Sequence, residues 1–161
     1  MARLLTAAVR AALVARWSAV PALSTPYATG AEPPQITRHA TDRWVGRERI
    51  VIDQTDGEMS IPTMRAGAKT TEHTFTVTVL VVAAIPGWSA DENEARAVEL
   101  AEAIIGDLTD TQTGPVLSGA VPGLVWCKPG QVRTRPDLVS IDGADVQAHV
   151  VELDLECLVR G

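Results

Sequence analysis

The chain has few aromatic residues, no block of positive charge and no long apolar run. Its 161 residues include one Phe, one Tyr and four Trp, so a core must be built mainly from aliphatic side chains. The net charge is −6, which argues against binding to the outside of nucleic acid, because such binding replaces counterions with Lys and Arg. No stretch approaches the roughly 20 apolar residues of a membrane span, and we expect no membrane partner.

Signals of secretion are missing too. Cys127 and Cys157 form no CxxC or Cys/His cluster. This favours two reduced, partly buried thiols, although spacing alone leaves a disulfide open. Arg10 and Arg16 interrupt the apolar N-terminal stretch, so no signal peptide is expected. We therefore expect synthesis in the cytoplasm.

Catalytic and metal-binding patterns are also lacking. His39, His73 and His149 are isolated, and no serine lies in a GxSxG elbow. His73 and His149 each lie at the start of a predicted strand, where a partly buried histidine is a better interpretation than a general base. No HExxH, paired-cysteine or calcium-loop pattern occurs. We predict that the protein is not an enzyme and uses no cofactor or metal. The carboxylates that gather at one turn are interpreted as solvated: Asp53, Asp56 and Glu58.

Hydrophobic periodicity predicts two helices and several strands. Residues 2–16 have apolar side chains at helical spacing, and residues 89–108 do so behind a capping box that begins at Ser89. The fold class is therefore predicted as α+β, an antiparallel or mixed β-sheet covered by an N-terminal helix and a central amphipathic helix. Alternating or β-branched runs predict strands at residues 49–53, 72–82, 124–126, 132–134, 138–141 and 146–159.

Residues 1–161 are predicted to form one domain with two stretches of irregular structure. Residues 21–47 are punctuated by proline and glycine, and residues 56–71 are predicted as a flexible arm. Irregular stretches as long as the first are uncommon in compact domains, and we expect a partner to order it. Within it, Trp44 is predicted to anchor the chain on the core.

One group of acidic residues recurs at every second position. Glu152, Asp154 and Glu156 alternate along the predicted last strand. Three interpretations are open for this acidic stripe. It is a solvated face, or it pairs with Arg133 and Arg135 at roughly 0.2–1 kcal/mol per pair. Alternatively, it lines a passage through which DNA slides without sticking.

The order of these elements carries a resemblance. An amphipathic helix precedes a proline-punctuated loop, a short strand Arg49-Ile-Val-Ile, and an alternating strand Glu72-His-Thr-Phe-Thr-Val-Thr-Val-Leu-Val-Val. A capped helix from Ser89 to Leu108 and a terminal hairpin from Val139 to Val159 follow. This order resembles the tail terminator (tail completion, minor tail) proteins of long-tailed bacteriophages.

The resemblance implies a structural virion protein at the head-proximal end of a tail, assembled in the host cytoplasm. Its members form a ring, usually a hexamer, that caps the tail tube and joins it to the head connector. Expected partners are other copies of the chain, the major tail tube protein, the head–tail connector protein, and DNA that passes without specific binding. Candidate interface or channel residues are Glu58, Met59, Met64, Arg65, Lys69, Glu152, Asp154 and Glu156.

Two other hypotheses remain open. The first is a neck or connector subunit, or an assembly adaptor. The second is a small enzyme or ligand-binding domain that uses His73 or His149 with nearby carboxylates.

Overall fold

The computed structural model confirms the predicted α+β class, with a five-stranded mixed sheet and helices. It describes residues 2–40, 42–44, 46–59, 63–65, 68–70, 72–109 and 116–160, without the side chains of residues 2–5, 54–59, 63–65, 68–70, 116 and 118. The elements are α1 (Ala2–Trp17), α2 (Pro21–Ser24), β1 (Gln35–Thr37), β2 (Glu48–Met59), β3 (Thr63–Arg65), β4 (Ala68–Thr70), β5 (Glu72–Ala83), α3 (Ala90–Thr109), the 3₁₀ turn η1 (Val116–Gly119), β6 (Leu124–Ile141) and β7 (Ala144–Arg160).

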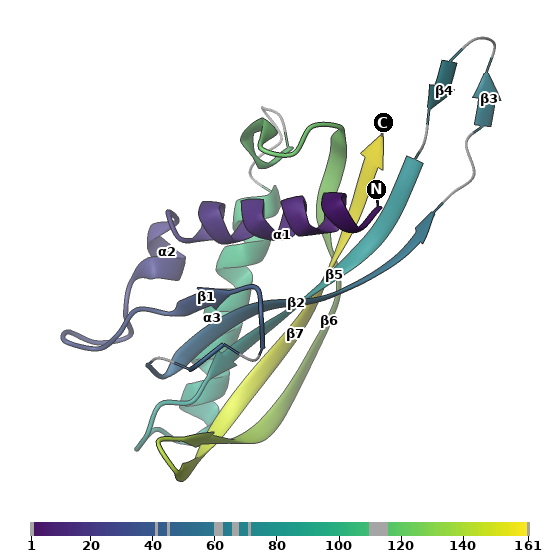
Figure 1. Ribbon diagram of the computed structural model, residues 1–161. Helices are drawn as coiled ribbons and strands as arrows, with labels where there is room; N and C mark the ends of the chain where they lie inside the picture. The colour runs from purple at the N-terminus through teal and green to yellow at the C-terminus, as the bar shows by residue number, and fades with distance from the viewer. Residues whose placement is uncertain are drawn as a thin grey trace.

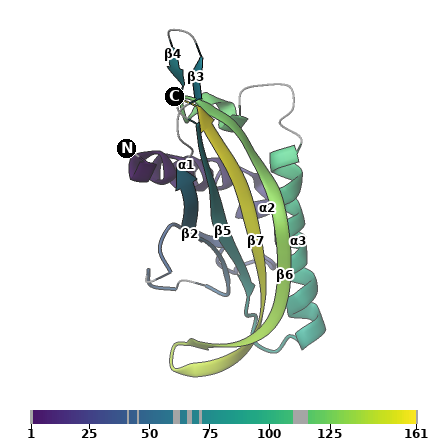
Figure 2. The ribbon, with the colours of Figure 1, turned by 90° about the vertical axis from the view of Figure 1, so that its right-hand side faces the viewer.

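The main sheet has the strand order β1-β2-β5-β7-β6. β1 runs parallel to β2, and the other neighbours are antiparallel. Figure 1 shows α1 lying across the strands and α3 running along them, and Figure 2 shows the long, curved β6–β7 hairpin beside α3. None of the described helices is long and apolar enough to cross a bilayer.

The main core lies between one face of the sheet and helices α1 and α3. Phe75, Val77, Val79 and Val81 of β5 are buried, as the alternation predicted. Trp17 at the end of α1 is fully buried among aliphatic neighbours, and each fully buried Val or Leu contributes about 1.5–3 kcal/mol. The predicted inward face of β7 is also buried: Val151, Leu153, Leu155, Cys157 and Val159.

α3 begins at the predicted capping box. The Ser89 N–H donates to Glu92 Oε2 (2.7 Å), and the Glu92 N–H donates to Ser89 Oγ (3.2 Å). Behind the cap, buried Asn93 accepts a hydrogen bond from the Ile85 N–H (2.9 Å). These contacts fix the start of α3 against the end of β5.

β6 is one strand of 18 residues, whereas three short strands were predicted. Pro129 and Pro136 lie between the three predicted strands. They are tolerated because β6 is an edge strand, where a proline needs no donor on its outer side. The register with β7 shifts between Pro129 and Val132, which also broke the alternation that sequence analysis relies on.

Residues 21–47 are less irregular than predicted, since they contain α2 and β1. The Arg49 guanidinium, on β2, donates to the carbonyl oxygens of His39 (3.0 Å), Ala40 (3.2 Å) and Asp42 (2.8 Å). It also lies over the Trp44 ring, 5.6 Å from the centroid. These bonds tie the end of the segment to β2.

Trp44 anchors the segment, as predicted. It packs against a second apolar cluster that includes Val82, Ile141 and Val150. This cluster lies on the face of the sheet opposite the helices, because these residues alternate with the buried positions of the main core. Trp44 thus covers part of that face.

Arg49→Ala is expected to loosen residues 38–44. The guanidinium satisfies three carbonyl groups at once, and its loss should lower the free energy of local opening by about 1.4 kcal/mol or more. Trypsin cleavage after Arg38 and Arg43 should then become about tenfold faster, measured by mass spectrometry of the native protein. Cleavage at an unchanged rate would show that Arg49 does not hold the segment.

The predicted arm, residues 56–71, forms strands in its described part. β2 continues to Met59, which pairs with His73 of β5, and β3 pairs with β4 in the register Met64↔Lys69. Figure 1 shows β3 and β4 projecting beyond the body of the molecule. The small, polar sequence hid these strands, because cross-strand pairing sets them more than propensity does.

Gly123 precedes β6 at a close approach to the end of β7. Its φ is +81°, and an added Cβ would lie 2.3 Å from the Arg160 carbonyl oxygen. Gly123→Ala should therefore lower the free energy of unfolding by about 2 kcal/mol or more, which chemical denaturation would measure.

Gly143→Ala is the matched control. Gly143 also has positive φ (+80°), but an added Cβ would meet nothing within 4 Å. This variant should cost only the conformational penalty of about 1–2 kcal/mol. Equal losses in the two variants would contradict the close contact at Gly123.

Candidate functional site

The three histidines do not assemble a site. His73 pairs with Val159, and His149 pairs with Ala83 at the other end of β5 and β7, which separates the two by about 33 Å along the strands. His149 is 7% exposed, and its Nε2 has no partner in the described part of the chain. Among the described residues, no three His, Cys, Asp or Glu side chains are placed to hold a metal ion.

The acidic stripe of β7 is paired with bases of β6. Arg133 donates to Glu152 and to Asp154 (3.2 Å), and Arg135 donates to Glu152 (3.4 Å). The Arg133 and Arg135 pairing allowed by the sequence is therefore observed. The hydrogen bond to Glu152 is the main cause that raises the pKa of Arg133.

The same face holds a third base and a hydroxyl. Lys128 lies 3.5 Å from Glu156, and Thr78 Oγ1 donates to Asp154 (3.2 Å). Three bases thus face three acids, so the stripe is largely neutralised within the subunit. A channel lining that repels DNA would need negative charge that is not compensated in this way.

The remaining interface candidates lie elsewhere. Glu58 and Met59 belong to β2, Met64 and Arg65 to β3, and Lys69 to β4, all on or next to the projecting hairpin. Their side chains lie outside the described part of the structure. The acidic stripe lies on the interior strand β7, between β5 and β6, and not on the strands that hold the other candidates.

Exposed large hydrophobic side chains concentrate on β6. In the described part of the chain there are four: Val125 (37% exposed), Trp126 (40%), Val132 (46%) and Leu138 (68%). Single exposed apolar residues are normal, but here all four lie on one edge strand. We call this strand, whose outer side pairs with no described strand, the β6 edge. The prolines and the bulge hide this strand in the sequence, because they break its alternation.

A shallow hollow continues the β6 edge. It has a volume of about 410 Å³ and lies where Leu138 and Pro136 meet His149 and the first residue of α3, Ala90. Its lining is mostly apolar, and Asp137 contributes its one acid. Asp137 Oδ1 already accepts the Leu138 N–H (2.8 Å). The hollow therefore extends the apolar surface and offers no set of converging polar groups.

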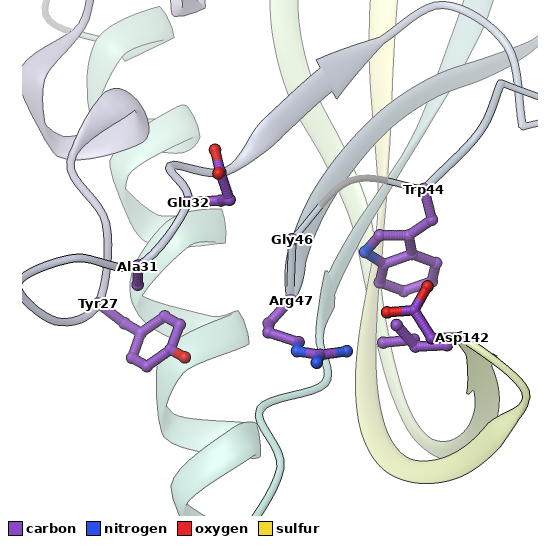
Figure 3. A pocket seen from close by; sticks show the side chains of 8 residues that line it. Tyr27, Ala31, Glu32, Trp44, Gly46, Arg47 and Asp142 are labelled. Atoms are coloured by element: carbon purple, nitrogen blue, oxygen red, sulfur yellow. The ribbon is translucent and has the colours of Figure 1, made fainter.

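A second cavity, of about 250 Å³, lies between residues 27–47 and the β6–β7 turn. Figure 3 shows the Arg47 side chain reaching toward Asp142, with Tyr27 on the other side and the Glu32 carboxylate pointing away. One base and two acids line it, and Trp44 Nε1 has no partner within the described residues. These mixed charges favour no single class of ligand.

Cys127 and Cys157 face each other on β6 and β7 as free, buried thiols. Their Sγ atoms are 3.4 Å apart, and the Cys157 S–H donates to Cys127. This hydrogen bond, together with burial, raises the pKa of Cys157. A neutral thiol is a poor nucleophile, so this geometry does not favour nucleophilic chemistry at Cys157.

The sites described above rest on geometry alone, because no protein-family model matches the chain and no curated protein is significantly similar to it.

Proposed function

We propose that the protein is a structural subunit of a long-tailed phage virion. It forms a ring, a hexamer by resemblance, that caps the tail tube and joins it to the head connector. The observation that carries the proposal is the β6 edge, an 18-residue edge strand with every large exposed hydrophobic side chain of the described chain. The order of elements, which resembles tail terminator proteins, gives the ring its place in the virion.

The β6 edge has a physical reason to meet another subunit. An edge strand presents unpaired N–H and C=O groups, which are a template for pairing with another chain. Removing Val125, Trp126, Val132 and Leu138 from water adds about 25 cal/mol for each Å² of apolar surface buried. Stable subunit interfaces of this kind bury more than roughly 2,000 Å², so other surfaces must add to this edge.

The projecting hairpin supplies a second contact. β3 and β4 pair only with each other among the described strands and extend past the main sheet (Figure 1). A two-stranded hairpin is marginally stable alone, so contact with a tube subunit or a neighbouring copy would stabilise it. The net charge of −6 suits a ring through which DNA passes without binding.

Native mass spectrometry at high micromolar concentration, with and without purified tail tubes, tests the proposal. We expect a closed ring mass and, by electron microscopy, density at one end of each tube. Val132→Glu/Leu138→Glu should abolish both, because it places charge on the apolar edge. Ala95→Glu/Ala120→Glu adds the same charge at exposed positions elsewhere and should abolish neither. A wild-type protein that stays monomeric and ignores tail tubes would overturn the proposal.

A further inference from the structure

We propose that Cys127 and Cys157 form a redox switch. Hydrogen peroxide oxidises Cys127, and Cys157 then closes a disulfide that joins β6 to β7. The switch needs only a single chain and is therefore independent of the proposed ring. It follows from the pairing of the two thiols, from the place of Cys127 on an edge strand and from the register shifts on both sides of it.

The two cysteines already meet the geometric requirement of a disulfide. Cys127 and Cys157 are directly paired in the antiparallel register of β6 and β7. Residues paired in this way have Cα atoms about 4.5–5.5 Å apart, and disulfides join Cα atoms about 4.4–6.8 Å apart. The Sγ atoms are 3.4 Å apart, so they can bond while the two strands stay paired.

Cys127 is the thiol on the edge of the sheet. It belongs to β6, whose outer side pairs with no described strand, whereas Cys157 belongs to β7 between β5 and β6. In the register, Phe75 of β5 borders Cys157 on the side away from Cys127. A small uncharged oxidant such as hydrogen peroxide can therefore approach Cys127 from the edge, while neighbouring strands flank Cys157 on both sides.

The stretch of β6 that carries Cys127 is paired less regularly than the rest of the hairpin. Its register with β7 shifts between Leu124 and Trp126 and again between Pro129 and Val132. The regular pairing between the two shifts covers residues 126–129. Few ladder bonds hold so short a stretch, and such stretches open locally more easily than the body of a sheet. Local opening exposes the buried Cys127 thiol to the oxidant.

Two steps convert the thiols to a disulfide. The Cys127 thiolate attacks one oxygen of hydrogen peroxide, the O–O bond breaks and hydroxide leaves, which produces a sulfenic acid. The Cys157 sulfur then attacks Cys127 Sγ, the S–O bond breaks, and the oxygen leaves as water with the Cys157 proton. The pair loses two electrons and two protons in total, and one peroxide is reduced to two waters.

The hydrogen bond between the thiols assigns these roles. The Cys157 S–H donates to Cys127 Sγ, so the proton that must leave with the oxygen already points at the oxidised sulfur. Atoms held about 3–3.5 Å apart react far faster than separate molecules, and the 3.4 Å between the sulfurs lies in this range. This proximity offsets the poor nucleophilicity of a neutral thiol. Cys157 therefore acts as the resolving thiol and needs no contact with the oxidant.

The disulfide fixes the edge of the sheet. It ties residues 126–129 to β7 between the two register shifts, and this stretch includes Trp126, one of the exposed apolar side chains of the β6 edge. It also closes the whole β6–β7 hairpin into a loop, and closing a loop stabilises mainly by restricting the unfolded chain. Oxidation should therefore raise both global stability and the local order of this stretch.

Peptide mapping of the native protein after exposure to hydrogen peroxide tests the proposal. We expect a crosslink between Cys127 and Cys157 of the same chain, which dithiothreitol reverses. After catalase has removed the peroxide, the midpoint of thermal unfolding should lie about 5–10 °C above that of the reduced protein. Hydrogen exchange of the amides of residues 126–128 should be about tenfold slower. Cys127→Ala/Cys157→Ala keeps the same methionines and should show neither change.

Two single variants test the order of the steps. Cys157→Ser lacks the resolving thiol and should accumulate the Cys127 sulfenic acid, which dimedone traps as a covalent adduct. Cys127→Ser keeps only the inner thiol and should give about tenfold less adduct. Equal labelling of the two variants would contradict the assigned order.

The wild-type protein decides whether the switch exists. Crosslinks only between chains, or no crosslink in protein that circular dichroism shows to be folded, would overturn the proposal. This result does not depend on whether the single variants fold.

Discussion

Arg96→Ala is expected to lower the free energy of unfolding by about 3–5 kcal/mol, because it leaves a buried carboxylate without its partner. That carboxylate belongs to Glu48, which is 0% exposed at the start of β2. The Arg96 Nε–H, on α3, donates to Glu48 Oε1, and the same guanidinium donates to the Thr25 carbonyl oxygen (3.2 Å). The second carboxylate oxygen, Glu48 Oε2, has no hydrogen-bond partner among the described residues.

Urea denaturation of three variants tests this effect. Arg133→Ala removes a guanidinium from exposed ion pairs (46% exposed) and should change the free energy of unfolding far less than Arg96→Ala, because solvent screens exposed pairs. Glu48→Leu/Arg96→Leu removes both buried charges and should recover most of the stability that Arg96→Ala loses. A loss below about 1 kcal/mol in Arg96→Ala would mean that water reaches Glu48.

The ion pair also bears on assembly. Glu48 and Arg96 join the first residue of β2 to the middle of α3, and Thr25 brings the end of α2 to the same point. Ring formation by Arg96→Ala should therefore be lost at a lower urea concentration than in wild type.

Local patterns in the sequence predicted the elements whose environment is regular along their length. β5 and β7 alternate because one face of each is buried, and α3 begins at a capping box that needs only Ser89 and Glu92. These signals lie within one element. Such signals can be recognised in the sequence without knowing which residues pack against the element.

Features that depend on contacts between distant segments were missed. Arg49 organises residues 38–44 from another strand, and no local signal marks it as the partner of three carbonyl groups. Glu48 lies just before the predicted strand 49–53 and is buried against Arg96, 48 positions away, a contact that no local pattern marks. The β6 edge was missed because prolines argue against a strand until its outer side is known to be free.

Pairing across strands was predictable where side chains alternate regularly between the two faces of the sheet. Arg133 and Arg135 were candidates for Glu152 because alternate residues share a face, and both bonds are present. The third base, Lys128, could not be assigned to the acidic stripe in this way. It lies beyond the bulge, where the alternation along β6 is interrupted. The interface candidates on the hairpin stay predictions.

The free energy of unfolding is expected to fall as pH rises above about 8.5, the pKa of a cysteine in an unfolded chain. The hydrogen bond to Cys127, together with burial, raises the pKa of Cys157 in the folded protein. Above pH 8.5 the unfolded state therefore loses a proton that the folded state keeps. Between that pH and the raised pKa of the folded thiol, stability should drop by about 1.4 kcal/mol per pH unit, and this contribution is constant below pH 8.5.

Urea denaturation of wild type and Cys157→Ala at pH 7.5, 9.5 and 10.5 isolates the thiol. Lys and Tyr titrate in both proteins, so only the difference between their slopes reports Cys157. Cys127→Ala removes the acceptor of the hydrogen bond and leaves burial as the cause of the raised pKa. In that variant the decline should level off at a lower pH than in wild type. Parallel pH profiles for wild type and Cys157→Ala would show that the Cys157 thiol ionises as readily in the folded sheet as in the unfolded chain.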